Sequence, residues 1–333
     1  MSELLIHNVR GNTVESTHHV SVAVTDSEGT LVARAGDPAR VTFMRSAAKP
    51  FQALPLVEDG AAERFAISST ELALACASHN SEEFQVNAVH ELLARLEFSE
   101  GDLICGPHAP LWKELSVIGD ARNPEIAGVA PSPIANNCSG KHTGMLALAK
   151  YHDWETRGYH EIRHPVQQRI VRELPTYIGM TATEIGHGTD GCGVPSFTVP
   201  LASLATAYAR LATSDATGPT TVVSSMLRHP EFVAGTGRLD TELMRRYEGR
   251  LLVKVGAGGV YAGAFIPRGW GLALKVEDGD NRAAIVAVMA VLGQLGVEPP
   301  PGSLVPEAQE LPIRNTREDQ VGVIRAEGEI AFV

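Results

Sequence analysis

The chain has 333 residues, of which 44% are hydrophobic and 20% are charged, and its formal net charge is −11. This composition is typical of a globular protein with a sizeable buried core. The acidic balance and the lack of a basic run argue against nucleic acid or an anionic membrane surface as a partner.

The N-terminal segment MSELLIHNVRGN has no basic start followed by a long apolar run. The most apolar stretch, AAIVAVMAVLGQLGV near residue 290, is too short and too interrupted to span a membrane. These features predict a cytoplasmic protein. In a reducing compartment its four cysteines are expected to be thiols or metal ligands and not disulfides.

In the first part of the chain, residues 18–34 alternate apolar and polar side chains around Ser-Glu-Gly, which predicts a β-hairpin. A helix is expected over AAKPFQALPLVEDG, where Pro50 is tolerable only in the first turn. Ser46 therefore lies at or just before a helix N-terminus. The next segment, STELALACASHNSEEFQVNAVHELLARLEF, has helical stretches on both sides of a break at Ser-His-Asn.

In the second part, helices are expected from about Lys141 and over HPVQQRIVRELPTYIG, and a glycine-rich loop then leads to a short strand and another helix. RLLVKVGAGGVYAGAFIP and GWGLALKVED are predicted to be two adjacent strands, with a closing helix over NRAAIVAVMAVLGQLG and a final strand over VGVIRAEGEIAFV. Strands thus lie at both ends of the chain, around a mainly helical region of about 45–250. This order predicts one α+β domain over 1–333, with an antiparallel sheet of terminal strands covered by helices.

Three short fragments could build a nucleophilic site. In Ser46-x-x-Lys49 one helical turn separates a hydroxyl from an amine, and burial of the amine would lower its pKa enough for it to accept the hydroxyl proton. Ser78-His79-Asn80 interrupts an apolar run, and Lys254-Val255-Gly256 stands at the end of another. Each fragment also has an ordinary interpretation: a helix start with a solvated lysine, a helix cap, and a strand-end lysine. Their order along the chain matches the S-x-x-K, S-D-N and K-T-G motifs of penicillin-recognising serine hydrolases, although the second and third motifs have different residues here.

Two cysteine-containing loops form a further candidate site. NNCSGKHTGML holds Cys138, Lys141 and His142, and GHGTDGCGVPSF holds Asp190 and Cys192. The two cysteines are 54 residues apart, which is no standard zinc-finger spacing. In glycine-rich polar loops, however, a structural cysteine has little apolar packing to gain. Two free thiols in turns are an equally good interpretation of the spacing, and Asp190 could orient a ligand or a bound water.

Taken together, eight fragments resemble the thermolabile, Rhizobium etli-type L-asparaginases, also called type II or class 3 asparaginases. They are MRSAAKPFQALPLVEDG, ELALACASHNSEEFQV, GPHAPL, NNCSGKHTGMLALAK, HPVQQRI, GTDGCGVPSF, GTGR and KVGAGGVYAGAF, and the resemblance covers about residues 18–296. It implies hydrolysis of L-asparagine to L-aspartate and ammonia, on a fold like that of serine β-lactamases and penicillin-binding proteins. It also implies a homodimer.

The resemblance implies roles for individual residues. Ser46 with Lys49, and Ser78 with Lys254, would form two serine–lysine tandems around an acylated serine. A zinc ion, whether or not turnover requires it, would be held by Cys138, Lys141 and Cys192. The residues expected near the substrate are Arg45, Asn80, His142 and Asp190. After GTGR the family is expected to have an aromatic or apolar residue and then cysteine, whereas this chain has Leu239 and Asp240.

Other activities fit parts of the same pattern. A glutaminase, or an enzyme with both activities, differs in substrate by one methylene, which is worth about 1–3 kcal/mol in an apolar pocket. A penicillin-binding or β-lactamase enzyme would need export. A zinc-dependent amino-acid-binding protein without catalysis would make both serine–lysine pairs accidental.

Overall fold

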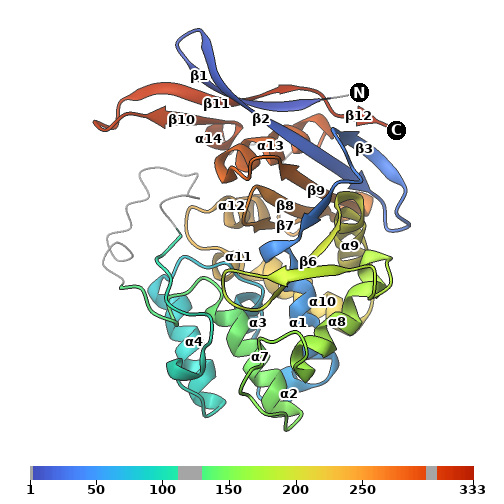
Figure 1. The fold of residues 1–333 in the computed structure, drawn as a ribbon, viewed down its shortest axis with the longest axis vertical. Coiled ribbons are helices and arrows are strands. Elements are labelled where there is room, and N and C mark those ends of the chain that lie inside the picture. Colours follow the sequence, from blue (N-terminus) through green and yellow to red (C-terminus); the bar gives the residue numbers. More distant parts are fainter. Residues whose placement is uncertain (1–2, 112–129, 298–305) are drawn as a thin grey trace. The chain divides into compact units, whose positions relative to one another are not determined.

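The computed structural model describes residues 3–111, 130–297 and 306–333, and these fall into two compact units (Figure 1). The first, called here the sheet unit, comprises Met1–Ala47, Val199–Thr213 and Arg246–Val333. The second, called the helical unit, comprises Ala48–Thr198 and Ser214–Arg245. The chain therefore leaves the sheet unit twice and returns to it twice.

The sheet unit is built on one antiparallel sheet in which strands from both ends of the chain are neighbours (Figure 1). The main path runs in the order β10-β11-β1-β2-β9-β8-β7, and β3 pairs with β2 and β12. The strands are β1 (Leu4–Arg10), β2 (Thr13–Thr25), β3 (Leu31–Ala35), β7 (Leu251–Gly256), β8 (Val260–Phe265), β9 (Trp270–Val276), β10 (Glu310–Arg314), β11 (Gln320–Gly328) and β12 (Ala331–Phe332). A further short strand, β4, is Val41–Phe43. This sheet confirms the predicted α+β class and the pairing of terminal strands.

The β2–β3 hairpin forms where the alternating pattern predicts it. The prediction for the 251–276 region is wrong in one respect, because the first of the two expected strands is itself a hairpin of β7 and β8. Gly258 and Gly259 both have φ near +70° (73° and 72°), and two consecutive residues in this region reverse the chain within a short turn. The glycines in KVGAGGV thus divide the stretch into two strands, with β9 as a third.

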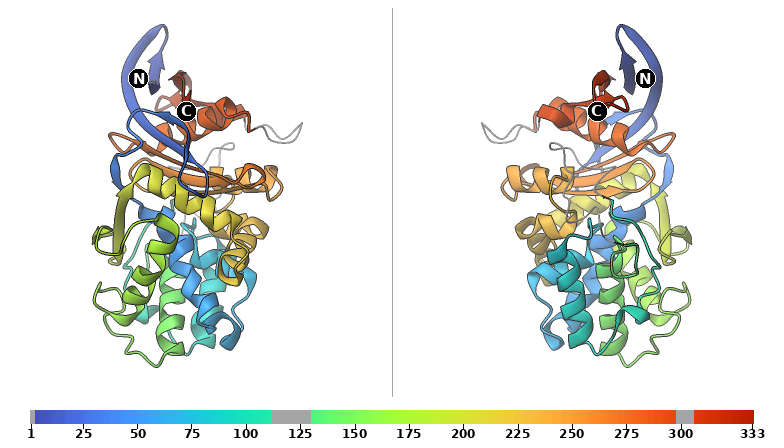
Figure 2. Two further views of the ribbon diagram at one scale, coloured as in Figure 1. Left: turned by 90° about the vertical axis from the view of Figure 1, so that its right-hand side faces the viewer. Right: turned by 90° about the vertical axis from the view of Figure 1, so that its left-hand side faces the viewer.

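Two long helices pack on this sheet. α9 (Leu201–Thr213) contacts β9, β2 and β8, and α13 (Asn281–Gln294) contacts β11, β9, β1 and β8. They lie on opposite faces of the strands β8 and β9 (Figure 2). Gly271 lets α9 approach closely, since a Cβ at this position would lie 1.8 Å from the carbonyl oxygen of Ala205. The unit also contains η3 (Ile266–Arg268) and α14 (Pro306–Gln309).

The helical unit is centred on α1 (Lys49–Glu58), which contacts α10, α8, α7 and α3. Every residue of α1 from Lys49 to Leu56 is buried, as expected for a helix surrounded by others. The chain enters it from the 3₁₀ turn η1 (Arg45–Ala48). The other elements are α2 (Ala61–Arg64), α3 (Ser69–Ala75), α4 (Glu83–Arg95), η2 (Glu100–Asp102), α7 (Ser139–Tyr151), α8 (Pro165–Ile178), β5 (Gly186–Thr189), β6 (Pro195–Pro200), α10 (Thr217–Arg228), α11 (Pro230–Val233) and α12 (Leu239–Arg246).

Local signals explain where these helices begin and end. Pro50 stands in the first turn of α1, as predicted, where its missing N–H costs nothing. Ser68 and Glu71 form a capping box at the start of α3. The predicted break at Ser-His-Asn falls between α3 and α4. Within the described ranges no helix has the length and apolar character needed to cross a membrane.

Candidate active site

Ser46 and Lys254 both belong to the sheet unit. Ser46 lies on η1 and is partly exposed, whereas Lys254 is fully buried on β7 and donates from Nζ to the carbonyl oxygen of Val255 at 3.0 Å. At the end of β7, a Cβ on Gly256 would lie 3.0 Å from the carbonyl oxygen of Met44. The sheet unit therefore brings the end of the lysine-bearing strand against the backbone just before Ser46.

Arg45, beside Ser46, has an unusual backbone conformation. Its φ is +50°, in the left-handed region that non-glycine residues seldom adopt. Such conformations cost of order 1–3 kcal/mol and gather at functional sites. This strain could not be predicted from the sequence, since Met-Arg-Ser is compatible with an ordinary helix start.

Lys49 and Ser78 meet inside the helical unit. Lys49 is 1% exposed, and its amine donates to Ser78 Oγ at 3.0 Å and also to the carbonyl oxygen of Ala77. Burial lowers the pKa of Lys49, and the charge of Lys141 lowers it further, while the Cys138 thiol opposes the shift. The structure thus bonds the lysine of the first predicted tandem to the serine of the second. The assignment of Ser46 to Lys49 and of Ser78 to Lys254 stays a prediction.

Asn80 is held by a residue that sequence reasoning missed. Asn80 is fully buried, and its Oδ1 accepts a hydrogen bond from Nη1 of Arg238 at 2.9 Å. Nη1 of Arg238 also donates to the carbonyl oxygen of Ser78 at 3.3 Å. Among the described residues Nδ2 of Asn80 has no hydrogen-bond partner. Arg238 is the arginine of the GTGR fragment, and only its 2% exposure reveals it as part of the site. Asp240, two residues later in the first turn of α12, is equally buried.

His79 links this segment to α7. Its Nε2 lies 2.8 Å from Ser139 Oγ, and its Nδ1 accepts the backbone N–H of Ser81 at 3.1 Å. Because Nδ1 is an acceptor here, the ring proton is on Nε2 and is donated to Ser139. Burial, and then the charges of Lys49 and Arg238, lower the pKa of His79 to about 3, so the ring stays neutral.

The predicted metal residues come together within the helical unit. Lys141, on the first turn of α7, donates from Nζ to Cys192 Sγ at 3.0 Å, and Cys192 lies in the turn between β5 and β6. The thiol of Cys138 also hydrogen-bonds Cys192, which lowers the pKa of Cys192 to about 5 and raises that of Cys138 to about 12. Burial lowers the pKa of Lys141, but the charges of the two cysteines and of Asp190 outweigh it and raise the pKa above its usual value. In this arrangement a Cys192 thiolate accepts hydrogen bonds from an ammonium and a thiol.

The donor set of this cluster fits a zinc ion. Zinc prefers sulfur and nitrogen ligands in a tetrahedral arrangement, and two buried sulfurs and one amine converge here. Over the described ranges, no three His, Cys, Asp or Glu side chains are arranged to hold a metal ion. A three-ligand site at this position would therefore need Lys141 as its third ligand, in the neutral form.

His142 follows Lys141 on α7 and is fully buried. Its Nδ1 lies 2.7 Å from the hydroxyl of Tyr159, a fully buried residue that sequence reasoning also missed. Burial, and then the charge of Lys141, lower the pKa of His142 to about 3. Nε2 of His142 has no hydrogen-bond partner in the described parts of the chain.

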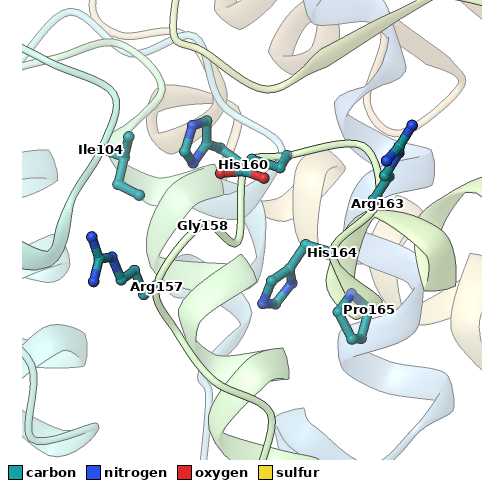
Figure 3. Close-up of a pocket in the computed structure, with 8 residues that line it drawn as sticks. Ile104, Arg157, Gly158, His160, Arg163, His164 and Pro165 are labelled. Carbon is teal, nitrogen blue, oxygen red and sulfur yellow. The ribbon is translucent and has the colours of Figure 1, made fainter.

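A surface cavity of about 680 Å³ is lined largely by residues that flank Tyr159 in the chain. It is lined by Ile104, Arg157, Gly158, His160, Glu161, Arg163, His164 and Pro165 (Figure 3). In Figure 3 the guanidinium groups of Arg157 and Arg163 lie on opposite sides of the cavity and point away from one another. None of the residues predicted from the sequence lines it, so it is not the site built above.

Comparison with known proteins connects the chain to a family. The family model described as L-asparaginase II matches residues 6–326. The chain is similar in structure to a β-lactamase from Mycobacterium bovis, with 14% identity over 78% of this chain and 87% of that chain, and a TM-score of 0.38. It is also similar to an octameric penicillin-binding protein homologue from Pyrococcus abyssi, with 14% identity over 86% of this chain and 75% of that chain, and a TM-score of 0.38. The comparison with curated proteins finds no match.

Proposed function

Because the chain belongs to the L-asparaginase II family, we propose that it hydrolyses L-asparagine to L-aspartate and ammonia with Ser46 as its nucleophile. The family match confirms the resemblance found in the sequence, and family membership implies hydrolysis of the asparagine side-chain amide. The observation that carries the serine–lysine chemistry is the buried amine of Lys49, 3.0 Å from Ser78 Oγ and three residues after Ser46.

In the proposed reaction, neutral Lys49 accepts the proton of Ser46 as Oγ attacks the side-chain amide carbon. A C–O bond forms, the C–N bond breaks, and the leaving nitrogen takes the proton that Lys49 accepted, relayed through Ser78 and Lys254, so that ammonia departs and Lys49 is neutral again. Water then attacks the ester, which releases L-aspartate and returns the proton to Ser46. Backbone N–H groups near Ser46 would stabilise the oxyanion, at about 2.7–4 kcal/mol per donor.

Accessibility supports Ser46 over Ser78 as the acylated residue. Ser46 is partly exposed, whereas Ser78 is 3% exposed and already bonded to Lys49. A nucleophile must reach a substrate carbon, while a proton relay works between buried groups. The left-handed conformation of Arg45 is consistent with a turn that is held to present Ser46.

The substrate-binding roles of Arg45, Asn80, His142 and Asp190 belong to the same proposal. Asn80 and His142 each offer a buried donor nitrogen with no partner in the described residues, and a bound amino acid supplies oxygen acceptors. Asp190 lies close enough to Lys141 to raise the pKa of that amine. A carboxylate there would also attract the α-ammonium of the substrate.

Zinc is the cofactor that the donor set supports. Cys138, Lys141 and Cys192 would hold it, and a bound zinc ion would polarise or position a substrate group. Binding would require Cys138 and Lys141 to lose their protons, so metal affinity should rise with pH. Zinc dependence, a homodimer and a cytoplasmic location all stay predictions.

The test is ammonia release from L-asparagine and, side by side, from L-glutamine. We expect purified protein to release ammonia from L-asparagine and Ser46→Ala to lose this activity. Ser224→Ala is the matched control, because its hydroxyl donates to the carbonyl oxygen of Thr221 within its own helix α10, and it should keep full activity. A parallel sample treated with a zinc chelator measures the role of the metal. Undiminished turnover by Ser46→Ala would overturn the proposed nucleophile, and no release by zinc-supplied wild type would overturn the proposed activity.

A further inference from the structure

Tyr159 places one hydroxyl between the backbone and a buried imidazole. Its oxygen accepts the backbone N–H of Ile104 at 3.1 Å and lies 2.7 Å from His142 Nδ1. The two rings meet edge to face, with centroids 5.6 Å apart and an interplanar angle of 74°. Gln167 on α8 fixes the tyrosine further, because its Nε2 donates to the carbonyl oxygen of Tyr159 at 2.9 Å. The hydroxyl is therefore anchored on both sides.

These contacts determine which atom carries the proton in the bond between Tyr159 and His142. A tyrosine hydroxyl has one proton, and His142 Nδ1 is the hydrogen-bond acceptor that the described residues offer it. If the hydroxyl donates, Nδ1 accepts, and the proton of the neutral ring lies on Nε2. If Nδ1 donated instead, the buried tyrosine proton and the Nε2 lone pair would both lack a partner. Since a buried polar group without a partner destabilises the folded state, the first arrangement, which leaves one fewer such group, is favoured.

In the favoured arrangement one polar group of the Tyr159–His142 pair has no hydrogen-bond partner among the described residues. The Nε2–H of His142 is a fully buried donor without an acceptor in the described residues. Native proteins rarely leave such a donor unpaired, and a ligand that brings an oxygen atom would satisfy it. Lys49, Lys141 and Cys138 all act electrostatically on this ring, so it lies among the residues proposed to act on asparagine.

We propose that Tyr159 is a positioning residue that holds His142 in the Nε2–H form, so that His142 donates this hydrogen bond to an oxygen of the bound amino acid. This inference rests on the proposed function for the identity of the ligand. It assigns His142 to binding and not to proton abstraction. It also excludes Nε2 of His142 as a metal ligand, because a ligating nitrogen must offer its lone pair.

The tautomer can be measured without any substrate. In protein labelled with ¹⁵N-histidine, long-range ¹H–¹⁵N spectra distinguish a ring protonated at Nε2 from one protonated at Nδ1, and His142→Gln assigns the signals. We expect wild-type His142 to carry its proton on Nε2, and Tyr159→Phe to shift it toward a mixture of both tautomers. A wild-type ring protonated at Nδ1 would overturn the proposal, whether or not the protein is an asparaginase.

Kinetics then test the role in binding. Tyr159→Phe should raise KM for L-asparagine about tenfold, equivalent to about 1.4 kcal/mol, with kcat changed less than about twofold. Tyr247→Phe is the matched control, since it also removes a buried tyrosine hydroxyl, which in Tyr247 donates to the carbonyl oxygen of Val297 at 2.8 Å. It should leave KM unchanged. A Tyr159→Phe variant with wild-type KM and tautomer would overturn the proposal, and one that fails to fold leaves the wild-type spectrum as the deciding measurement.

A competitive inhibitor identifies the acceptor oxygen. The compound 3-aminopropanamide keeps the amide and the amine of asparagine but lacks the α-carboxylate. If His142 donates to the carboxylate, Tyr159→Phe should leave the inhibition constant of this compound unchanged while the KM for asparagine rises. If His142 donates to the amide oxygen, both should rise together. Each result supports the proposed donor and names its partner.

Discussion

Glu58, the last residue of α1, is predicted to lower the stability of the protein as pH rises through neutrality. Arg169 on α8 faces three carboxylates there: Nη2 lies 3.0 Å from Glu58 and 2.8 Å from Asp59, and Nη1 lies 2.7 Å from Glu173. The charge of Arg169 is shared among three carboxylates, of which only Asp59 has a further basic neighbour among the described residues, His152 at 2.8 Å, and the C-terminal end of a helix disfavours anions further. Burial first, and then the hydrogen bond and charge of Glu173, raise the pKa of Glu58 to about 7. We therefore expect the stability of Glu58→Gln relative to wild type to be greater at pH 8 than at pH 5.

The size of the effect follows from the shift. A pKa raised in the folded state stabilises fully below the unfolded value, 4.5 for Glu58, and that contribution is lost as pH rises through about 7. At 1.36 kcal/mol per pKa unit, the limit is about 3.4 kcal/mol. Solvent reaches the Glu58 side chain, which is 26% exposed, and screens part of this interaction. We therefore expect the variant to gain about 1–2 kcal/mol relative to wild type between pH 5 and pH 8.

Thermal unfolding at the two pH values measures this gain. For folded units of this size, 1 kcal/mol corresponds to about 2–4 °C in Tm, so Glu58→Gln should gain about 2–8 °C relative to wild type between pH 5 and pH 8. Glu97→Gln is a control of opposite sign, because Lys150 lowers the pKa of the Glu97 carboxyl and no gain at pH 8 is expected. A Tm difference between Glu58→Gln and wild type that stays the same at both pH values would refute the reasoning.

Three further predictions follow from contacts in the structure. Gly271→Ala should lower the unfolding free energy by about 3 kcal/mol or more, because its Cβ would lie 1.8 Å from a backbone carbonyl oxygen of α9. In the control Gly293→Ala the new Cβ meets nothing within 4 Å, so this variant should not be destabilised. Thermal unfolding of the two variants tests this difference. Arg238→Met should lower kcat/KM for asparagine about tenfold, because the buried Asn80 amide loses the partner that fixes its orientation; an unchanged kcat/KM would remove this role. Cys138→Ala should mainly raise the KM for asparagine in steady-state assays, since the proposed metal positions substrate, and a fall in kcat at constant KM would contradict that.

The sequence predicted the elements best where local chemistry fixes them. Pro50 at the start of α1 and the polar break at Ser78 depend on rules that act within one turn of chain. The hairpin at Gly258 was missed because the flanking apolar residues read as one continuous strand. Two adjacent positive-φ glycines decide the reversal, and either glycine alone is compatible with a strand.

The candidate site, like the secondary structure, could be predicted only in part from the sequence. Cys138 and Cys192 could be identified from the fragments that resemble the family, and the structure brings them together. Arg238 and Tyr159 could not be found, because their roles depend on burial and on partners far away in the sequence. An arginine in a polar loop is normally solvated, and a lone tyrosine is normally part of a core. Only their tertiary packing distinguishes Arg238 and Tyr159 from a solvated arginine and an ordinary core tyrosine.

The register of the sheet has a consequence for how the chain is made. Leu4 on β1 pairs with Gly328 on β11, so the inner strand β1 acquires its second neighbour only after more than 300 further residues have been synthesised. At about 5–20 residues per second, a ribosome needs on the order of 15–65 s to cover that interval. During this time β1 presents an open hydrogen-bonding edge to other nascent chains. Expression at high level should therefore favour association through β1, and slower initiation or lower temperature should increase the yield of dispersed protein.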